Sequence, residues 1–244
     1  MAVLGALAMT QQDKAEAPTA EQRALAWTHT ARFLTTASQL HQLPSSDLPE
    51  IAFVGRSNAG KSTAINTLTQ HKRLAFASKT PGRTQHINLF ELGPKTAPDA
   101  LFADLPGYGY AAVAREAKQR WQLVMAEYLQ VRRNLAGVVL MIDSRLGITE
   151  LDMNLLEFVS PRVLTGQAKL LVLLTKADKL NRREANAALA GAQTVLGGLA
   201  TDESDVNVAL FSALSRAGVG EAAAMLRNWV ARPAAAIEAG SETI

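Results

Sequence analysis

The segment Gly55 to Ser62 reads G-R-S-N-A-G-K-S and decides the fold of this 244-residue chain. It matches the phosphate-loop pattern G-x-x-x-x-G-K-[ST] at every fixed position. In that pattern, backbone N–H groups form a nest for phosphate oxygens at the start of a helix. Lys61 would neutralise the terminal phosphates, and the Ser62 hydroxyl would bind a magnesium ion that bridges the last two. The predicted phosphate contacts are Gly55, Arg56, Ser57, Asn58, Ala59, Gly60, Lys61, Ser62 and Thr63.

The sequence around this loop predicts alternating strands and helices. Ile51–Val54 is a short apolar run suited to a buried strand, and Ser62–Leu68 can continue as a helix. Two further apolar runs, Val138–Ile142 and Leu170–Leu174, are typical of central parallel strands that are buried on both faces. We therefore predict a three-layer, doubly wound α/β domain with a mostly parallel sheet.

The remaining elements follow from the same periodicities. His86–Leu92 and Ala100–Leu105 are predicted to form an antiparallel ribbon at one edge of the sheet. The other expected segments are a short helix passing into an edge strand over Glu21–Ala37, helices over Arg115–Leu135, Glu150–Val159, Glu184–Leu196 and Glu221–Val230, and a last strand over Val206–Phe211.

Composition narrows the class of protein. Hydrophobic residues make up 48% of the chain and charged residues 19%, which is ordinary for a soluble globular protein. No apolar run reaches the roughly 18 residues that a membrane span needs, and no cysteine is present. We expect a cytoplasmic monomer that contacts neither membrane nor DNA. The formal net charge of +3 permits contact with RNA without requiring it.

The motif D-L-P-G at Asp104–Gly107 follows the second ribbon strand. Its position places a carboxylate at the end of a strand that faces the nucleotide. Asp104 could hold a magnesium-bound water there, and the Gly107 N–H could meet the γ-phosphate. Leu105 and Pro106 complete this predicted contact segment.

The motif T-K-A-D at Thr175–Asp178 follows the strand Leu170–Leu174 and identifies the base. A carboxylate at Asp178 can accept hydrogen bonds from the ring N–H and the exocyclic amine of guanine, whereas adenine offers neither donor there. Lys176 would lay its aliphatic stem along the base. The Ala213 N–H in Phe211–Ala213 could meet the guanine carbonyl oxygen. The predicted base contacts are Thr175, Lys176, Ala177, Asp178, Phe211, Ser212 and Ala213.

Four stretches together resemble the EngB family of bacterial ribosome-assembly GTPases, within the translation-factor-like class. They are E-I-A-F-V-G-R-S-N-A-G-K-S, S-K-T-P-G-R-T-Q-x-I-N-L-F, D-L-P-G-Y-G-Y-A and L-L-T-K-A-D-K-L. The resemblance runs from about Phe33 to Trp229 and implies a phosphate-loop GTPase domain of the Ras-like fold. It also implies magnesium-dependent GTP hydrolysis, assembly of the large ribosomal subunit and a link to cell division and septation. One departure is Ser212-Ala213, where many relatives have two serines.

By the same resemblance, Thr84 is the switch threonine, whose hydroxyl reaches magnesium only when GTP closes the loop. The resemblance therefore implies a metal set of Ser62, Thr84 and Asp104, the last through water, and adds Gly82, Arg83 and Thr84 to the nucleotide contacts. Lys79 and Arg83 have two readings, a solvated basic loop or a surface that meets ribosomal RNA phosphates.

The residue after D-L-P-G is Tyr108, where many GTPases have a glutamine that orients the attacking water. We therefore expect slow intrinsic hydrolysis, helped either by the ribosomal partner or by a potassium ion. The alternative reading of Tyr108, and the one we favour for Tyr110, is a plain switch-packing residue. Asn58 occupies the position at which potassium-activated GTPases carry an asparagine, although asparagine also suits a tight turn. The expected catalytic residues are Lys61, Thr84, Gly107 and, as a potassium ligand, Asn58.

These observations lead to one functional prediction and one alternative. The prediction is a GTP-hydrolysing switch that assists assembly of the large ribosomal subunit and its RNA. The alternative is a nucleotide-gated binding module with negligible turnover that acts in division or RNA binding. We expect the GTPase domain to span residues 21–232, with flexible tails at 1–20 and 233–244.

Overall fold

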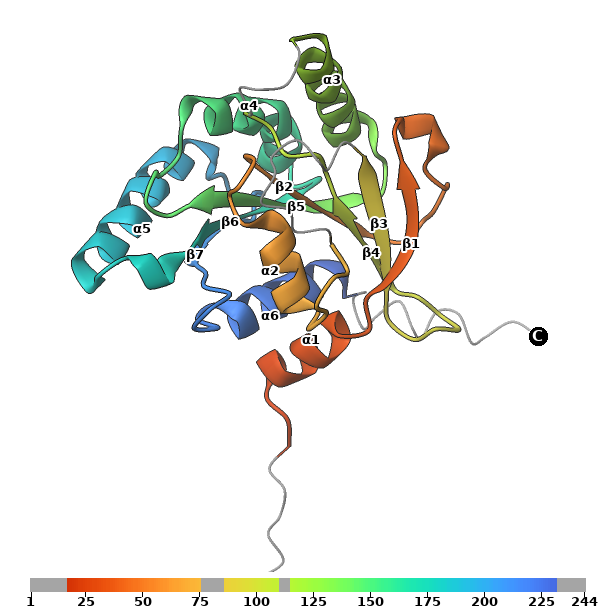
Figure 1. Ribbon diagram of the computed structural model, residues 1–244, viewed down its shortest axis with the longest axis horizontal. Coiled ribbons are helices and arrows are strands. Elements are labelled where there is room, and N and C mark those ends of the chain that lie inside the picture. Colours follow the sequence, from red (N-terminus) through yellow and green to blue (C-terminus); the bar gives the residue numbers. More distant parts are fainter. Residues whose placement is uncertain (1–16, 76–85, 110–114, 232–244) are drawn as a thin grey trace, which may run out of the picture.

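The computed structural model of the chain describes residues 17–75, 86–109 and 115–231. Within these residues, one seven-stranded sheet has the order β1-β3-β4-β2-β5-β6-β7 (Figure 1). Strands β4, β2, β5, β6 and β7 are parallel, and β3 runs antiparallel to both of its neighbours. The strands are β1 (Arg32–Ala37), β2 (Glu50–Gly55), β3 (Ile87–Leu92), β4 (Ala100–Asp104), β5 (Leu135–Asp143), β6 (Lys169–Thr175) and β7 (Val206–Leu210).

Helices cover both faces of the sheet (Figure 1), and two clusters of buried side chains assign each helix to one face. Helices α1, α2 and α6 pack on one face, and α3, α4 and α5 pack on the other. Their bounds are α1 (Ala20–Thr28), α2 (Lys61–Leu68), α3 (Arg115–Val131), α4 (Glu150–Leu164), α5 (Arg182–Leu196) and α6 (Val219–Val230). Three short 3₁₀ turns in the described residues are Leu40–Gln42, Ala177–Lys179 and Gly197–Leu199. The predicted three-layer α/β architecture is confirmed.

Alternation along the central strands explains the two cores. In β2, Ile51 and Phe53 face the α1, α2 and α6 layer, whereas Ala52 and Val54 face the α3, α4 and α5 layer. All of these side chains are buried, as expected of a parallel strand covered on both faces. The continuous apolar runs in the sequence therefore mark strands that contribute to both cores.

The antiparallel β3–β4 ribbon is present, and β1 is the predicted edge strand, which pairs with β3 at the outermost position. Two helices end elsewhere than predicted. Helix α4 continues past Val159 to Leu164. Helix α3 ends at Val131 rather than Leu135, because Leu135 already pairs with Glu50 in the sheet. The sequence prediction carried the helical spacing through the polar segment 132–134, which forms the turn before β5.

A buried ion pair joins the start of β2 to the end of α3. Glu50 is fully buried and accepts hydrogen bonds from Arg132 Nε and Nη2, both at 3.1 Å. The buried Tyr128 hydroxyl also donates to this carboxylate. The Arg132 Nη2 additionally donates to the Pro44 carbonyl at 3.1 Å. These contacts satisfy the buried charges and fix the strand that leads to the phosphate loop.

A second polar cluster joins α1, α6 and the turn between β3 and β4. The Trp27 indole N–H donates to Asp99 Oδ1 at 2.8 Å, and Arg227 Nη1 donates to Asp99 Oδ2 at 2.7 Å. The Arg227 guanidinium lies over the Trp27 ring at 5.0 Å from its centroid, a cation–π arrangement. The first and last helices of the described domain are thus joined through one aspartate.

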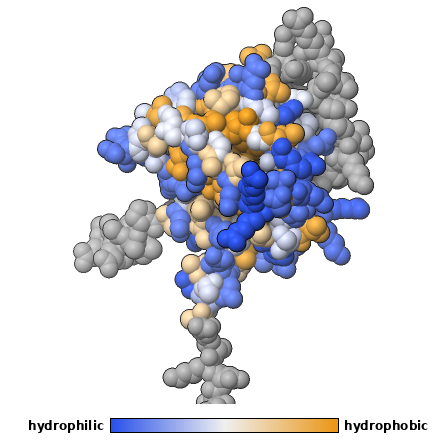
Figure 2. Space-filling model, turned by 90° about the vertical axis from the view of Figure 1, so that its left-hand side faces the viewer, coloured by the Kyte–Doolittle hydropathy of each residue, from blue (hydrophilic) through white to orange (hydrophobic). Residues whose placement is uncertain are grey.

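Figure 2 shows the side of the molecule on which α5 lies in Figure 1, with apolar residues gathered in its upper part among hydrophilic ones. A hollow of about 650 Å³ lies between the segment 144–148 and α5, and the exposed Leu146 is part of its lining. It contains none of the residues predicted to bind nucleotide.

Among the helices that the structure describes, none has the length and apolarity to cross a membrane.

Candidate functional site

The phosphate loop connects the carboxyl end of β2 to α2. A Cβ atom at Gly55 would lie 2.7 Å from the Met141 carbonyl oxygen, so only glycine allows β2 this close approach to β5. Gly60 adopts φ 91° and is the N-cap of α2. Lys61, Ser62 and Thr63 form the first turn of that helix. The loop therefore presents backbone N–H groups at a helix N-terminus, the arrangement that binds phosphate.

Asp104 lies beside the phosphate loop at the end of β4. It pairs in register with Phe53 of β2 and forms a buried ion pair with Lys61. Its Oδ2 atom is buried and has no hydrogen-bond partner among the described residues. An unpartnered carboxylate oxygen close to the Ser62 turn fits a site for a hydrated magnesium ion. The side chains present are therefore consistent with the predicted metal set, apart from Thr84, which lies outside the described residues.

The D-L-P-G loop is held directly against the phosphate loop. The Ser57 N–H donates to the Tyr108 carbonyl at 2.8 Å, and Arg56 and Tyr108 form an isolated parallel bridge. A Cβ atom at Gly107 would lie 3.2 Å from Ser57 Oγ and 3.3 Å from Ser57 N, which is tighter than most contacts of this kind. Gly107 is thus packed directly against the phosphate loop, and its contact with the γ-phosphate stays a prediction.

The Tyr108 side chain turns away from the phosphate loop and toward α4. Its hydroxyl donates to Asp152 Oδ1 at 2.6 Å, and Asp152 Oδ2 accepts from the Thr149 N–H at 2.8 Å to cap the helix. Burial, reinforced by the nearby Asp152 charge, raises the pKa of Tyr108 far above its ordinary value. Tyr108 is therefore a neutral hydrogen-bond donor to α4 and offers no amide to an attacking water.

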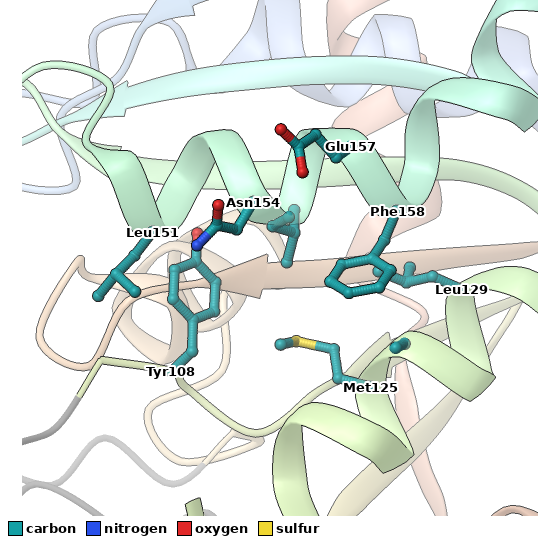
Figure 3. A pocket seen from close by; sticks show the side chains of 9 residues that line it. Tyr108, Met125, Leu129, Leu151, Asn154, Glu157 and Phe158 are labelled. Carbon is teal, nitrogen blue, oxygen red and sulfur yellow. The ribbon is translucent and has the colours of Figure 1, made fainter. Parts of the chain in front are cut away.

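Figure 3 shows Tyr108 beside Leu151 and Asn154 at one end of a hollow between α3 and α4. This hollow has a volume of about 280 Å³ and is mainly apolar, with Met125, Leu129 and Phe158 at its other end. Tyr108 thus contributes to a surface formed by two helices. The sequence left two readings of Tyr108 open, a replacement for glutamine and a plain packing residue, and did not predict the contact with Asp152.

The base-recognition segment Thr175–Asp178 connects to the phosphate loop through side chains. Thr175 Oγ1 donates to the Ala59 carbonyl at 2.6 Å, and Lys176 Nζ donates to the Asn58 carbonyl at 2.8 Å. The Ala177 N–H donates to the Phe211 carbonyl at 3.1 Å, which brings the F-S-A segment alongside. The predicted phosphate and base contacts therefore meet at one edge of the sheet.

Asp178 is oriented by Ser212, a residue predicted only as part of the F-S-A triplet. The buried Ser212 hydroxyl donates to Asp178 Oδ1 at 2.7 Å, and its oxygen accepts from the Ser215 N–H at 3.1 Å. The hydrogen bond from Ser212 lowers the pKa of Asp178. Asp178 is thus an ionised acceptor at neutral pH, as a reader of two guanine donors requires.

Asn58 lies at the exposed tip of the phosphate loop with φ 67°, in the left-handed region. Asparagine tolerates this conformation better than most residues, which accounts for its presence without a metal. The same conformation leaves the side chain exposed next to the phosphate nest. Both readings of Asn58 therefore stay open.

Several predicted residues fall outside the described part of the chain. These are Gly82, Arg83 and Thr84 of the nucleotide set, together with Lys79 and Tyr110. Their roles stay predictions.

The structure also brings in two residues that the sequence reading passed over. Asp143 ends β5, and Arg145 follows it; both line a hollow of about 200 Å³ with Arg56, Asn58 and Lys176. The sequence did contain a signal for Asp143, since a carboxylate that ends a buried strand beside the phosphate-loop strand is expected to lie near the bound nucleotide.

The fold and the site together define a phosphate-loop nucleotide-binding protein of the GTPase class.

Comparison with known proteins identifies the family. The family model described as "50S ribosome-binding GTPase" matches residues 50–176. A protein of Polaromonas sp. (strain JS666 / ATCC BAA-500), named as a GTP-binding protein EngB, is 60% identical over 219 residues, which cover 90% of this chain and 86% of that protein. The chain belongs to the EngB family of GTP-binding proteins and is a GTP-hydrolysing phosphate-loop GTPase.

Solved structures agree on the fold. A crystal structure of a GTP-binding protein engB has a TM-score of 0.55 at 20% identity and covers 74% of this chain and 98% of that one. A variant of Era from Aquifex aeolicus, bound to GDP and AlF4−, has a TM-score of 0.60 at 20% identity and covers 76% of this chain and 58% of that one. At such identities the likeness extends to the fold alone.

Proposed function

We propose that this GTPase is a switch that assists assembly of the large ribosomal subunit in the bacterial cytoplasm, with a linked role in cell division and septation. The observation that carries the proposal is the match of residues 50–176 to a family described as 50S ribosome-binding. The basic residues Lys79 and Arg83, in the segment predicted to switch, are compatible with contact to RNA phosphates.

The site provides a physical basis for switching. Asp104 and Gly107 belong to the loop that is attached to the phosphate loop at Ser57, so a γ-phosphate bound there would contact both segments. Magnesium held by Ser62, Thr84 and, through water, Asp104 would supply charge neutralisation at the phosphates. Loss of the γ-phosphate would release segments 79–85 and 105–114, and hydrolysis would then time release from the ribosomal precursor.

The direct test is cosedimentation with purified large and small ribosomal subunits in the presence of GDP, GTP or a non-hydrolysable GTP analogue. We expect retention on the large subunit with the analogue, weaker retention with GDP, and little retention on the small subunit. The small subunit is the control for non-specific attraction between a basic protein and RNA. Strong binding in the GDP state alone would overturn the proposed timer.

The second candidate, a binding module with negligible turnover, is favoured by Tyr108, whose hydroxyl is committed to Asp152 and cannot orient water. Measuring GTP hydrolysis with and without large-subunit particles separates the two. Stimulation by the particles supports the switch, whereas unchanged and negligible turnover supports the binding module.

We further propose that a potassium ion assists hydrolysis at Asn58. Turnover is expected to be about tenfold or more faster in potassium than in sodium at equal ionic strength, because a fixed cation would stabilise charge on the transferring phosphate. Asn58→Gly is the informative variant, since glycine keeps the left-handed turn at φ 67° but removes the amide oxygen. The variant should lose the difference between the two ions. Equal rates of the unmodified protein in potassium and sodium would sink the idea.

A further inference from the structure

The carboxylate of Asp143 occupies a junction between three segments of the site. It ends β5, between the phosphate-loop strand β2 and the base-recognition strand β6. Its Oδ2 atom accepts a hydrogen bond from Lys176 Nζ at 2.8 Å. The Lys176 ammonium therefore lies between this carboxylate and the Asn58 carbonyl of the phosphate loop, which it also meets at 2.8 Å.

Arg145 fixes Asp143 from the other side. Arg145 Nε donates to Oδ1 at 2.9 Å and Nη2 donates to Oδ2 at 2.7 Å, while the backbone N–H of the same residue reaches Oδ1 at 3.2 Å. The Asp143 side chain is only 8% exposed, whereas that of Arg145 is 51% exposed. The hydrogen bonds from Arg145 are the main reason that the pKa of Asp143 lies well below its ordinary range. The carboxylate is therefore charged and held in one orientation.

Lys176 needs such an anchor because of its position along the nucleotide. Its backbone adopts φ 58°, in the left-handed region, and begins the turn that carries Asp178. Its side chain runs from that turn to the phosphate loop, so it spans the distance between the groups that read the base and those that bind phosphate. A fixed head lowers the entropic cost of laying the lysine stem over a purine, because a free lysine samples many rotamers.

We propose that Asp143 is a positioning residue for guanine nucleotide binding, which fixes Lys176 across the purine and against the Asn58 carbonyl. It touches neither base nor phosphate and acts through the lysine. Because Lys176 would contact the purine ring itself, Asp143 should strengthen the binding of any purine nucleoside diphosphate or triphosphate. Asp178 determines the preference for guanine over other purines. Asp143 therefore sets the strength of binding and leaves base selectivity unchanged.

The test is titration calorimetry with GDP and inosine diphosphate, which lacks the exocyclic amine that Asp178 reads. Asp143→Ala should weaken both nucleotides about tenfold, as expected for loss of a hydrogen bond to a charged group, and should keep the ratio of their Kd values. Asp143→Asn retains an acceptor oxygen and should weaken them by about threefold. In steady-state assays KM should rise, with kcat changed by less than about twofold.

A double-mutant cycle and a matched control complete the design. If Asp143 acts through Lys176, the double variant Asp143→Ala with Lys176→Ala should bind GDP no more weakly than Lys176→Ala alone. Asp202→Ala removes an exposed carboxylate outside the nucleotide site and should bind GDP as the unmodified protein does. Multiplicative effects in the cycle, or a loss in Asp202→Ala equal to that in Asp143→Ala, would overturn the proposal. If Asp143→Ala does not fold, the cycle with Asp143→Asn applies the same criterion.

Discussion

Asp178→Asn is expected to lower the affinity for GTP by about a hundredfold, because the two hydrogen-bond donors of guanine would lose an ionised acceptor. The Ser212 hydroxyl donates to Oδ1 of this carboxylate at 2.7 Å and keeps it in place. An asparagine would turn either its amide hydrogens or its single carbonyl oxygen toward the base. Calorimetric titration with GTP measures the loss.

Xanthosine triphosphate gives this prediction an internal check. Xanthine carries a carbonyl oxygen where guanine carries its exocyclic amine, so the asparagine amide can donate to it and the preference between the two nucleotides should reverse. Asp202→Asn makes the same chemical change at an exposed site and should bind GTP normally. Unchanged GTP affinity in Asp178→Asn, together with equal competition by ATP, would show that Asp178 does not read the base.

Glu50→Gln is expected to lower the free energy of unfolding of the nucleotide-free protein by about 3–5 kcal/mol, because it leaves the Arg132 charge without its buried partner. Arg132 is 13% exposed and makes two 3.1 Å contacts with the Glu50 carboxylate. The Tyr128 hydroxyl would also lose a charged acceptor. Urea denaturation followed by circular dichroism measures the change.

Two control variants separate the buried charge from local packing. Arg133→Ala changes a neighbouring exposed arginine and should alter stability by less than about 0.5 kcal/mol. Replacing both Glu50 and Arg132 with methionine removes the pair together and should recover much of the stability lost in Glu50→Gln. A Glu50→Gln protein within 1 kcal/mol or so of the parent would contradict the view that this pair holds β2 to α3.

The sequence predicted the layers and the nucleotide motifs because both depend on short segments. Ile51–Val54 and Gly55–Ser62 contain their own strand, turn and helix signals, and the structure has β2 and α2 at those places. The D-L-P-G and T-K-A-D motifs likewise follow strands, so the parallel order of β4, β2, β5 and β6 brings them together. The three-layer fold could therefore be derived before any contact was known.

The contacts of Tyr108 and Asp143 could not be predicted in the same way. The hydrogen-bonded residues Tyr108 and Asp152 lie 44 residues apart in the sequence, and Lys176 and Asp143 lie 33 residues apart. Neither pair has a local spacing that marks it, and each depends on how helices and strands pack. Glu50 illustrates the same limit, since a glutamate at the start of a strand is ordinarily solvated and only the approach of Arg132 explains its burial.

The link between α1 and α6 through Asp99 has a consequence for biosynthesis. A ribosome makes α1 first and α6 last, so Trp27 can pair with Asp99 early, but Arg227 reaches both of them only near the end of translation. Until then one apolar face of the sheet lacks a helix that helps to cover it. The layer of α1, α2 and α6 is therefore completed late in vectorial folding. The nascent chain depends on α6 to finish covering the sheet face on which α1 already packs.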